Sequence, residues 1–352
     1  MEERMSKGPI LVTGVTGFVG GYVALDLLDQ GYDVRGTVRN PDRADVAHLR
    51  SAADKAGTRL ELVAASLLDD DGWDAAVDGV TAVEHVASPA PKYRPMDEEE
   101  VIRPAVDGTR RVLQAAARAG VKRIALTSSV DAIRAGHNLS DGRELSEDVW
   151  SVVERAEPYA KSKTIAERAA WADAASLGID LTVLNPSLIL GPVQTATTNV
   201  SVDIIRQLLT GELSGLPRLG FAPVDVRDVA TAHRVVLERP EAIGRRYVLS
   251  TEAIWLADIA RVLAEEYNPK GYSVPTRAIP GWIVRLGARF DPTLRLALPL
   301  LNQPARNSSA RARTELGWTT RETRTTILET AESLVAAGIV KPVATFIPSV
   351  PG

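Results

Sequence analysis

Residues 10–20 read ILVTGVTGFVG, a short apolar run that leads directly into three spaced glycines. The run at 10–13 predicts a buried strand, and residues 19–30 predict a helix that ends before Gly31. Glycines between a strand and a helix permit a tight turn, and they let the backbone approach a pyrophosphate placed at the helix N-terminus. This stretch therefore predicts a dinucleotide-binding turn.

The same alternation of strand and helix patterns continues through the first half of the chain. Apolar, β-branched runs and Ala/Leu-rich amphipathic segments follow each other in order, with strands expected at 33–38, 60–64, 82–87, 122–127 and 180–184 and helices at 44–56, 73–77, 101–119 and 158–177. Repeated β-α-β units produce a parallel sheet with helices on both faces. We therefore expect the α/β class, with a Rossmann-type doubly wound parallel sheet.

After Pro186 this pattern breaks. Glycines and prolines surround one expected helix at 202–209, and a helix at 226–237 and a strand at 247–250 then return to the sheet. We expect a Rossmann domain formed by residues 8–190, with 223–250 returning to it. A smaller, interleaved C-terminal lobe, formed by 191–222 and 251–352, is expected to bind the substrate.

The composition excludes several classes of protein. The 352 residues include 41 Lys and Arg against 45 Asp and Glu, a net charge of −4, so there is no basic field for nucleic acid. Without cysteine there is no disulfide or thiol nucleophile, and the four histidines lack metal-ligand spacing, so we expect no metal site. Charged residues interrupt the apolar stretch 282–301, and the N-terminus lacks a signal-peptide core. We expect a soluble cytoplasmic monomer or homodimer that binds no membrane.

A tyrosine and a lysine lie four residues apart at the start of the expected helix 158–177. Tyr159 and Lys163 therefore project from one helical face, whereas Lys161 lies off that face. An ammonium about 4 Å from a phenol, at an effective dielectric constant of about 20, favours the phenolate by about 4 kcal/mol. That energy brings a tyrosine pKa from about 10 towards 7, where the group can act as an acid or a base. A serine hydroxyl from Ser128-Ser129, after the strand 122–127, could orient a carbonyl beside it.

The residues after the second expected strand predict which dinucleotide binds. An acid at this position accepts a hydrogen bond from the 2′-hydroxyl of the adenosine ribose. Here the sequence is Val38-Arg39-Asn40, with Arg43 close by. A guanidinium matches a 2′-phosphate, so we predict NADP(H) as the cofactor.

These motifs resemble those of the extended short-chain dehydrogenases/reductases. The resemblance is strongest to the branch of dihydroflavonol reductases, cinnamoyl-CoA reductases and microbial NADPH-dependent aldehyde and ketone reductases. It covers nearly the whole chain, through residues 12–20, 37–41 (TVRNP), 85–89 (HVASP), 127–129, 159–171 (YAKSKTIAERAAW), 191–192, 224–233 and 315–318 (ELGW).

The resemblance implies a catalytic set and extends the cofactor site. Ser129, Tyr159 and Lys163 would be catalytic, with Ser128 as the alternative serine. In the glycine turn, the residues expected at the cofactor are Thr13, Gly14, Thr16, Gly17, Phe18, Val19 and Gly20. The further cofactor contacts are Arg39, Arg43, Ser66, Leu67, Ala87, Ser88, Pro186, Ser187 and Leu188, together with Tyr159 and Lys163.

The chain also departs from the family pattern. Ser66 replaces an aspartate that helps to hold the adenine, and Asn185 replaces a common arginine. Arg134 stands where the plant flavonoid enzymes use an asparagine to hold the substrate, so dihydroflavonols are not the expected substrate. We place Arg134 with Ser129 and Tyr159 in the substrate site, where it would meet an anionic or carbonyl-rich group; the alternative is that it faces solvent. The remaining matches, His85, His233, Trp150 and Trp171, are interpreted as structural.

The expected activity is an NADPH-dependent reduction of an aldehyde or ketone, reversible as oxidation of a secondary alcohol. Substrate specificity is expected to lie in Arg134, 138–149, 194–217 and 279–301. One alternative is a nucleotide-sugar epimerase or dehydratase, which the missing acid after the second strand disfavours. A more remote alternative is a non-catalytic nucleotide-sensing protein, although such proteins typically lose the tyrosine or the lysine that this chain keeps.

Overall fold

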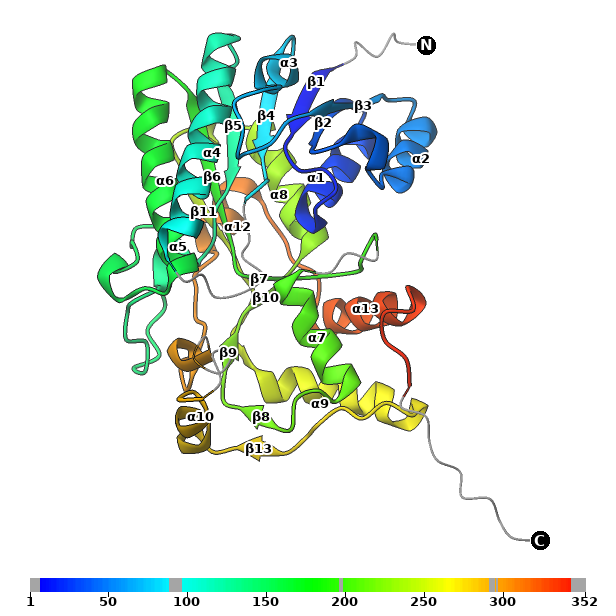
Figure 1. Ribbon diagram of the computed structural model, residues 1–352, viewed down its shortest axis with the longest axis vertical. Coiled ribbons are helices and arrows are strands. Elements are labelled where there is room, and N and C mark those ends of the chain that lie inside the picture. The colour runs from blue at the N-terminus through cyan, green and yellow to red at the C-terminus, as the bar shows by residue number, and fades with distance from the viewer. Residues whose placement is uncertain (1–6, 89–96, 196–198, 291–294, 296, 343–352) are drawn as a thin grey trace, which may run out of the picture.

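The computed structural model describes residues 7–88, 97–195, 199–290, 295 and 297–342. Its centre is a seven-stranded sheet in which every pair of neighbouring strands is parallel (Figure 1). In spatial order the strands are β11 (Arg246–Leu249), β6 (Asp180–Pro186), β5 (Arg123–Thr127), β4 (Ala82–His85), β1 (Lys7–Val12), β2 (Tyr32–Val38) and β3 (Leu60–Ala64). The order reverses between β1 and β4, and ligands of such sheets bind at this switch point. The predicted doubly wound Rossmann-type fold is confirmed.

Helices cover both faces of the sheet. One face carries α3 (Trp73–Val77), α4 (Glu99–Arg118) and α6 (Pro158–Leu177), whose alanines and leucines share an apolar cluster with the strands. The other face carries α1 (Phe18–Asp29), α2 (Ala47–Ala56), α8 (Val226–Glu238) and α12 (Ala310–Leu316). A short helix, α5 (Asp131–Arg134), follows β5 directly. The central strand β4 is buried at every residue, including Glu84 and His85, as expected for a parallel sheet covered on both faces.

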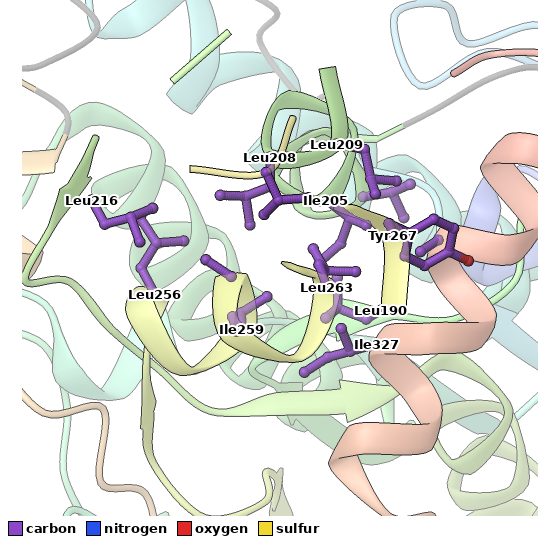
Figure 2. Packing of buried hydrophobic residues seen from close by; sticks show 14 of the residues in the cluster. Leu190, Ile205, Leu208, Leu209, Leu216, Leu256, Ile259, Leu263, Tyr267 and Ile327 are labelled. Atoms are coloured by element: carbon purple, nitrogen blue, oxygen red, sulfur yellow. The ribbon is translucent and has the colours of Figure 1, made fainter. Parts of the chain in front are cut away.

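A second body of structure lies beyond the carboxyl end of the sheet (Figure 1). Its strands form three short pairs: β7 (Leu188–Leu190) with β10 (Pro223–Asp225), β8 (Leu216–Pro217) with β13 (Ala278–Ile279), and β9 (Gly220–Phe221) with β12 (Ile254–Trp255). Its helices are α7 (Val200–Thr210), α9 (Leu256–Tyr267), α10 (Gly281–Gly287) and α13 (Thr323–Ala336). Figure 2 shows leucines and isoleucines of α7 and α9 packed together with Ile327 of α13.

Two of the boundaries that differ from the sequence prediction do so for local reasons, and the short strands of the lobe were not predicted. The helix expected from residue 44 begins at Ala47, because Pro41–Arg43 forms a separate 3₁₀ turn capped by the Asn40 side chain. The strand expected to reach residue 87 ends at His85, where the next amides turn towards Thr13. The two-residue strands of the lobe are too short to show an alternating pattern.

The chain position of an element does not fully decide which body it joins. Residues 223–250 supply α8 and β11 to the large sheet. However, α12 comes later in the chain and still packs against β11. The assignment of 8–190 and 223–250 to the Rossmann domain, and of 191–222 and 251–352 to the substrate lobe, therefore remains a proposal.

Two absences hold for the described residues. None of the helices there is both long and apolar enough to cross a membrane. No group of three or more His, Asp or Glu side chains in the same residues is arranged to hold a metal ion.

Candidate functional site

The glycine turn joins β1 to α1 at the switch point of the sheet. Gly14 has a φ of +71°, and its N–H donates to Thr37 Oγ1 at 3.0 Å. A Cβ on Gly20 would overlap the carbonyl oxygen of Gly14, so glycine is needed for α1 to begin this close to β1. Within the described residues no side chain caps the N-terminus of α1, which leaves its first amides available to a phosphate. Thr16 and Gly17 are exposed there, while Phe18 and Val19 are half-buried.

A buried hydrogen-bond chain holds the residues after β4 against this turn. Val86 N–H and Ala87 N–H donate to Thr13 Oγ1 at 3.0 and 2.9 Å, and that oxygen lies 3.0 Å from His85 Nδ1. Burial lowers the pKa of His85 to about 3, so its imidazole is neutral. Its Nε2 lies 3.3 Å from the hydroxyl of Thr109. His85 is therefore structural, as expected, and Ala87 packs against Gly14.

The arginines near the end of β2 divide into two kinds. The Arg35 guanidinium already donates to Glu61 and to the carbonyl oxygens of three residues in or next to α3, so its role is structural. Arg39 and Arg43 are exposed beyond the strand, and within the described residues neither guanidinium has an ion pair. The position therefore offers a free cation instead of the carboxylate that reads a 2′-hydroxyl.

Ser66 and Leu67 lie on the turn after β3. Ser66 Oγ accepts a hydrogen bond from Leu68 N–H at 3.2 Å, and its carbonyl accepts from Trp73 Nε1 at 3.1 Å. Leu67 packs on Gly108, where a Cβ would meet its side chain at 2.8 Å. The serine is thus a weak hydrogen-bonding group at a position where the family has an acid.

The two serines after β5 point to different partners. Ser128 Oγ donates to the fully buried carboxylate of Glu167 at 2.5 Å. Ser129 Oγ accepts from Asp131 N–H at 3.0 Å, and it is the hydroxyl whose hydrogen bonding lowers the pKa of Tyr159. The structure therefore brings Ser129, not Ser128, to the tyrosine.

Tyr159 and Lys163 project from one side of α6, one turn apart. Tyr159 keeps 37% of its surface exposed, but protein packed around the phenol desolvates it and raises its pKa; Asp131 raises this pKa further, and the Ser129 hydrogen bond lowers it. Lys163 is buried, and burial lowers its pKa to about 8. The expected fall of the Tyr159 pKa towards 7 is therefore absent, because burial and Asp131 raise this pKa and the Lys163 ammonium is not among the groups that lower it.

Asp131 and Arg134 occupy the short helix α5 next to Ser129. Burial raises the pKa of Asp131, and burial lowers the pKa of Arg134. The charge of each residue opposes the pKa shift that burial causes in the other. Among the described residues, however, the two side chains form no ion pair within 4.0 Å. Sequence reasoning found Arg134 and missed Asp131, although Asp131 lies two residues after the predicted serine.

Residues 186–188 connect the sheet to the lobe. Ser187 N–H donates to the Leu249 carbonyl at 3.0 Å, and Ser187 Oγ donates to the Ala222 carbonyl. Leu188 begins β7, and Pro186 ends β6 where its carbonyl accepts from Val130 N–H at 3.0 Å. These contacts fix residues 186–188 beside the Ser129 turn.

The other matched residues are structural, as expected. His233 lies between Glu84, at 2.5 Å from Nδ1, and Thr127, at 2.9 Å from Nε2. Trp150 stacks against Arg246, whose guanidinium carbon is 3.9 Å from the ring centre, and Trp171 borders the α4–α6 core. Lys161 forms an ion pair with Glu98 at 2.7 Å, away from Tyr159.

Two hollows among the described residues differ in kind. A small cavity of about 20 Å³ is lined by Ala87, Ser88, Ser128, Lys163 and Glu167, so it joins the glycine-turn side to the catalytic candidates. A wide, open hollow of about 780 Å³ lies at the opposite, amino end of β1–β3 and contains none of the predicted site residues. The glycine turn and the uncapped N-terminus of α1 lie on the side of the small cavity, next to Ala87, and they fit a dinucleotide pyrophosphate.

Parts of three predicted segments lie outside the described residues. These are Pro89 of the 85–89 motif, residues 196–198 of the predicted specificity stretch 194–217, and residues 291–294 and 296 of the stretch 279–301.

Comparisons with known proteins agree with this geometry. The profile of the NAD dependent epimerase/dehydratase family matches residues 10–250. Cinnamoyl-CoA reductase 1 of Arabidopsis thaliana is 39% identical over 272 residues, covering 76% of this chain and 77% of that protein. Tetraketide alpha-pyrone reductase 1 of the same plant is 36% identical over 271 residues, covering 74% and 82%. The crystal structure of yeast methylglyoxal/isovaleraldehyde reductase complexed with NADPH superposes with a TM-score of 0.76 at 26% identity, covering 94% of this chain and 100% of that one.

Most of the chain is covered by both the family profile and a relative of 39% identity. The chain therefore belongs to the NAD dependent epimerase/dehydratase family, the extended short-chain dehydrogenases/reductases that its motifs resemble.

Proposed function

We propose that this protein is an NADPH-dependent carbonyl reductase that converts an aldehyde or ketone to the alcohol, and catalyses the reverse oxidation. The observation that carries the proposal is the grouping of Ser129, Tyr159 and Lys163 at the small cavity that Lys163 shares with Ala87, the residue packed against Gly14 of the glycine turn. The names of the relatives, reductases of carbonyl compounds, support the same class of reaction.

Each residue has a defined task in the reaction. When bound, NADPH supplies the hydride that forms the new C–H bond. Tyr159 gives its proton to the carbonyl oxygen, and its raised pKa ensures that the phenol holds that proton at neutral pH. Ser129 Oγ–H donates to the same oxygen and stabilises the developing charge. The Lys163 ammonium, one turn away, stabilises the phenolate that remains.

The cofactor and substrate contacts follow from the same arrangement. The glycine turn receives the pyrophosphate, and Arg39, with Arg43, receives the 2′-phosphate. Arg134 is proposed as the contact for a polar or anionic group of the substrate, since its guanidinium lacks an ion pair within the described residues.

Loss of NADPH absorbance with a panel of aromatic aldehydes, α-ketoesters and diketones tests the proposal. We expect turnover with at least one of these classes, and Tyr159→Phe should lower kcat/KM by about 10²- to 10⁴-fold, the usual contribution of a general acid. Unchanged turnover in Tyr159→Phe would reject this tyrosine as the acid. Dinucleotide that stays bound through gel filtration, without net NADPH consumption, would favour an epimerase or dehydratase.

A further inference from the structure

Glu167 lies in α6 and its side chain is completely buried. Its two carboxylate oxygens accept four hydrogen bonds from different elements. The donors are Ser128 Oγ at 2.5 Å, Arg246 Nε at 2.6 Å, Asn185 Nδ2 at 2.9 Å and Trp171 Nε1 at 3.4 Å. A buried carboxylate needs this degree of pairing to keep its charge.

Two of these donors belong to the structure that carries Ser129. Ser128 is its neighbour in the chain, and Asn185 Nδ2 also donates to the Ser129 carbonyl oxygen at 3.0 Å. Glu167 thereby joins the turn after β5 and the end of β6 to α6. That helix carries Tyr159 at the other end of the same face.

Glu167 follows Lys163 by four residues, as Lys163 follows Tyr159. The three side chains therefore project from one side of α6. Lys163 and Glu167 both line the small cavity of about 20 Å³ described above. Lys163 therefore lies between Tyr159 and Glu167 along this side of α6.

Charge in this cluster is not balanced by one ion pair. Arg246 neutralises Glu167 directly, and it is held by the carbonyl oxygens of Glu147 and Val149. Lys163 adds a second buried positive charge, with Asp131 as the other carboxylate near it. Removing the charge of Glu167 would leave two buried cations with one acidic neighbour.

We propose that Glu167 is a positioning residue: it fixes the Ser129 turn against the helix of Tyr159 and Lys163, and its negative charge keeps Lys163 an ammonium. This inference rests on the reductase function proposed above. Glu167 acts through its neighbours and has no contact with the reacting carbonyl.

The charges that face Lys163 support the second half of the proposal. Burial lowers the pKa of Lys163 to about 8, and Glu167, followed by Asp131, opposes that shift. His85 faces it from β4 as a neutral ring, and Tyr159, one helical turn before it in α6, is a neutral phenol. Without the carboxylate charge, the pKa of Lys163 falls further, so the ammonium is lost at a lower pH.

Two substitutions separate charge from geometry. Glu167→Gln keeps the size but removes the charge, and we expect a 10- to 100-fold loss of kcat and an alkaline limb of the pH–rate profile that moves to lower pH. Glu167→Asp keeps the charge but withdraws it by one methylene, so kcat should fall while the alkaline limb stays in place. The matched control is Asp228→Asn in α8, which removes a buried carboxylate that is hydrogen-bonded to Arg321. This variant should lose stability and keep the wild-type pH profile.

A second readout does not depend on turnover. Acetic anhydride labelling of the dinucleotide-free protein, followed by mass spectrometry, measures the pH at which Lys163 becomes a reactive free amine, with Lys161 as the internal reference. Lys163 should react at lower pH in Glu167→Gln than in the wild type or in Glu167→Asp. Identical labelling curves in folded wild type and Glu167→Gln overturn the charge role, and an unchanged kcat in Glu167→Asp overturns the geometric role. A wild type that reduces no carbonyl refutes the proposed function instead, while the labelling still decides the role of Glu167.

Discussion

The carboxyl edge of the sheet and the lobe beyond it are built on different principles. At the sheet edge, the important groups are backbone atoms and buried polar side chains with specific partners, such as Gly14, Thr13 and Glu167. The lobe instead has a core of aliphatic side chains from α7, α9 and α13 (Figure 2). Its helix α10 leaves large apolar side chains exposed, Trp282 at 64% and Leu286 at 49%.

Under the proposed function, the sheet edge holds the cofactor and the lobe selects the substrate. Directional hydrogen bonds and glycine backbone conformations tolerate few residue types, so they conserve one geometry. An aliphatic core tolerates many sequences of similar volume, and exposed apolar residues are free to vary with the substrate. Substitutions at the sheet edge should therefore change binding and catalysis, and substitutions in the lobe should change stability or substrate range.

The largest stability effect is expected inside the lobe core. Leu263 is fully buried between α7 and α13, so Leu263→Ala should lower the free energy of unfolding by about 2–5 kcal/mol. Leu286→Ala, the same change on exposed α10, should alter it by less than about 0.5 kcal/mol. Urea unfolding measures both, and NADPH affinity of the folded variants should match the wild type. An equal loss in the two variants would contradict the packing described here.

The next effect concerns the glycine turn. Gly20→Ala places a methyl group against the Gly14 carbonyl oxygen, which forces α1 away from β1. An overpacking cost of about 1–3 kcal/mol corresponds to an increase of about 5- to 150-fold in the Kd for NADPH, measured by fluorescence titration. Gly281→Ala in the lobe is the control, because its added Cβ meets atoms only at 3.4 Å or more. If Gly20→Ala binds NADPH normally, the close approach of α1 is not what builds the cofactor site.

A smaller effect should distinguish the two kinds of arginine near β2. Arg39→Gln removes the free cation, and losing a charge-assisted hydrogen bond of about 1.5–3 kcal/mol should weaken NADPH by about 10- to 100-fold. NADH, without the 2′-phosphate, should bind almost unchanged. Arg35→Gln should lower stability and preserve the NADPH to NADH ratio of Kd values, because Arg35 binds Glu61 and nearby carbonyls. Parallel losses for both dinucleotides in Arg39→Gln would argue against a 2′-phosphate contact.

The sequence could predict the features that depend on neighbouring residues, but not those that depend on contacts between distant parts of the chain. The glycine turn, the Tyr159–Lys163 spacing and the alternation of strands and helices are local patterns, and the structure has them as expected. Glu167 is four residues from Lys163, a spacing visible in the sequence, but its partners Ser128 and Arg246 come from positions 39 and 79 residues away. No local pattern reports such contacts, nor the burial that raises the pKa of Tyr159. The two-residue strands of the lobe likewise form only through tertiary pairing.

The smallest effect on stability is expected at α10, where the lobe presents its surface. Trp282→Ala should change the free energy of unfolding by no more than about 0.5 kcal/mol, because the ring is 64% exposed. An exposed tryptophan beside Ile283 and Leu286 is typical of a surface that contacts an apolar ligand, and it lies in the stretch 279–301 predicted to set specificity. We therefore expect KM to rise for bulky aromatic ketones and to stay constant for small aldehydes, with the NADPH Kd unchanged. An equal change in KM for large and small substrates would show that α10 acts on the fold of the site and not on the substrate.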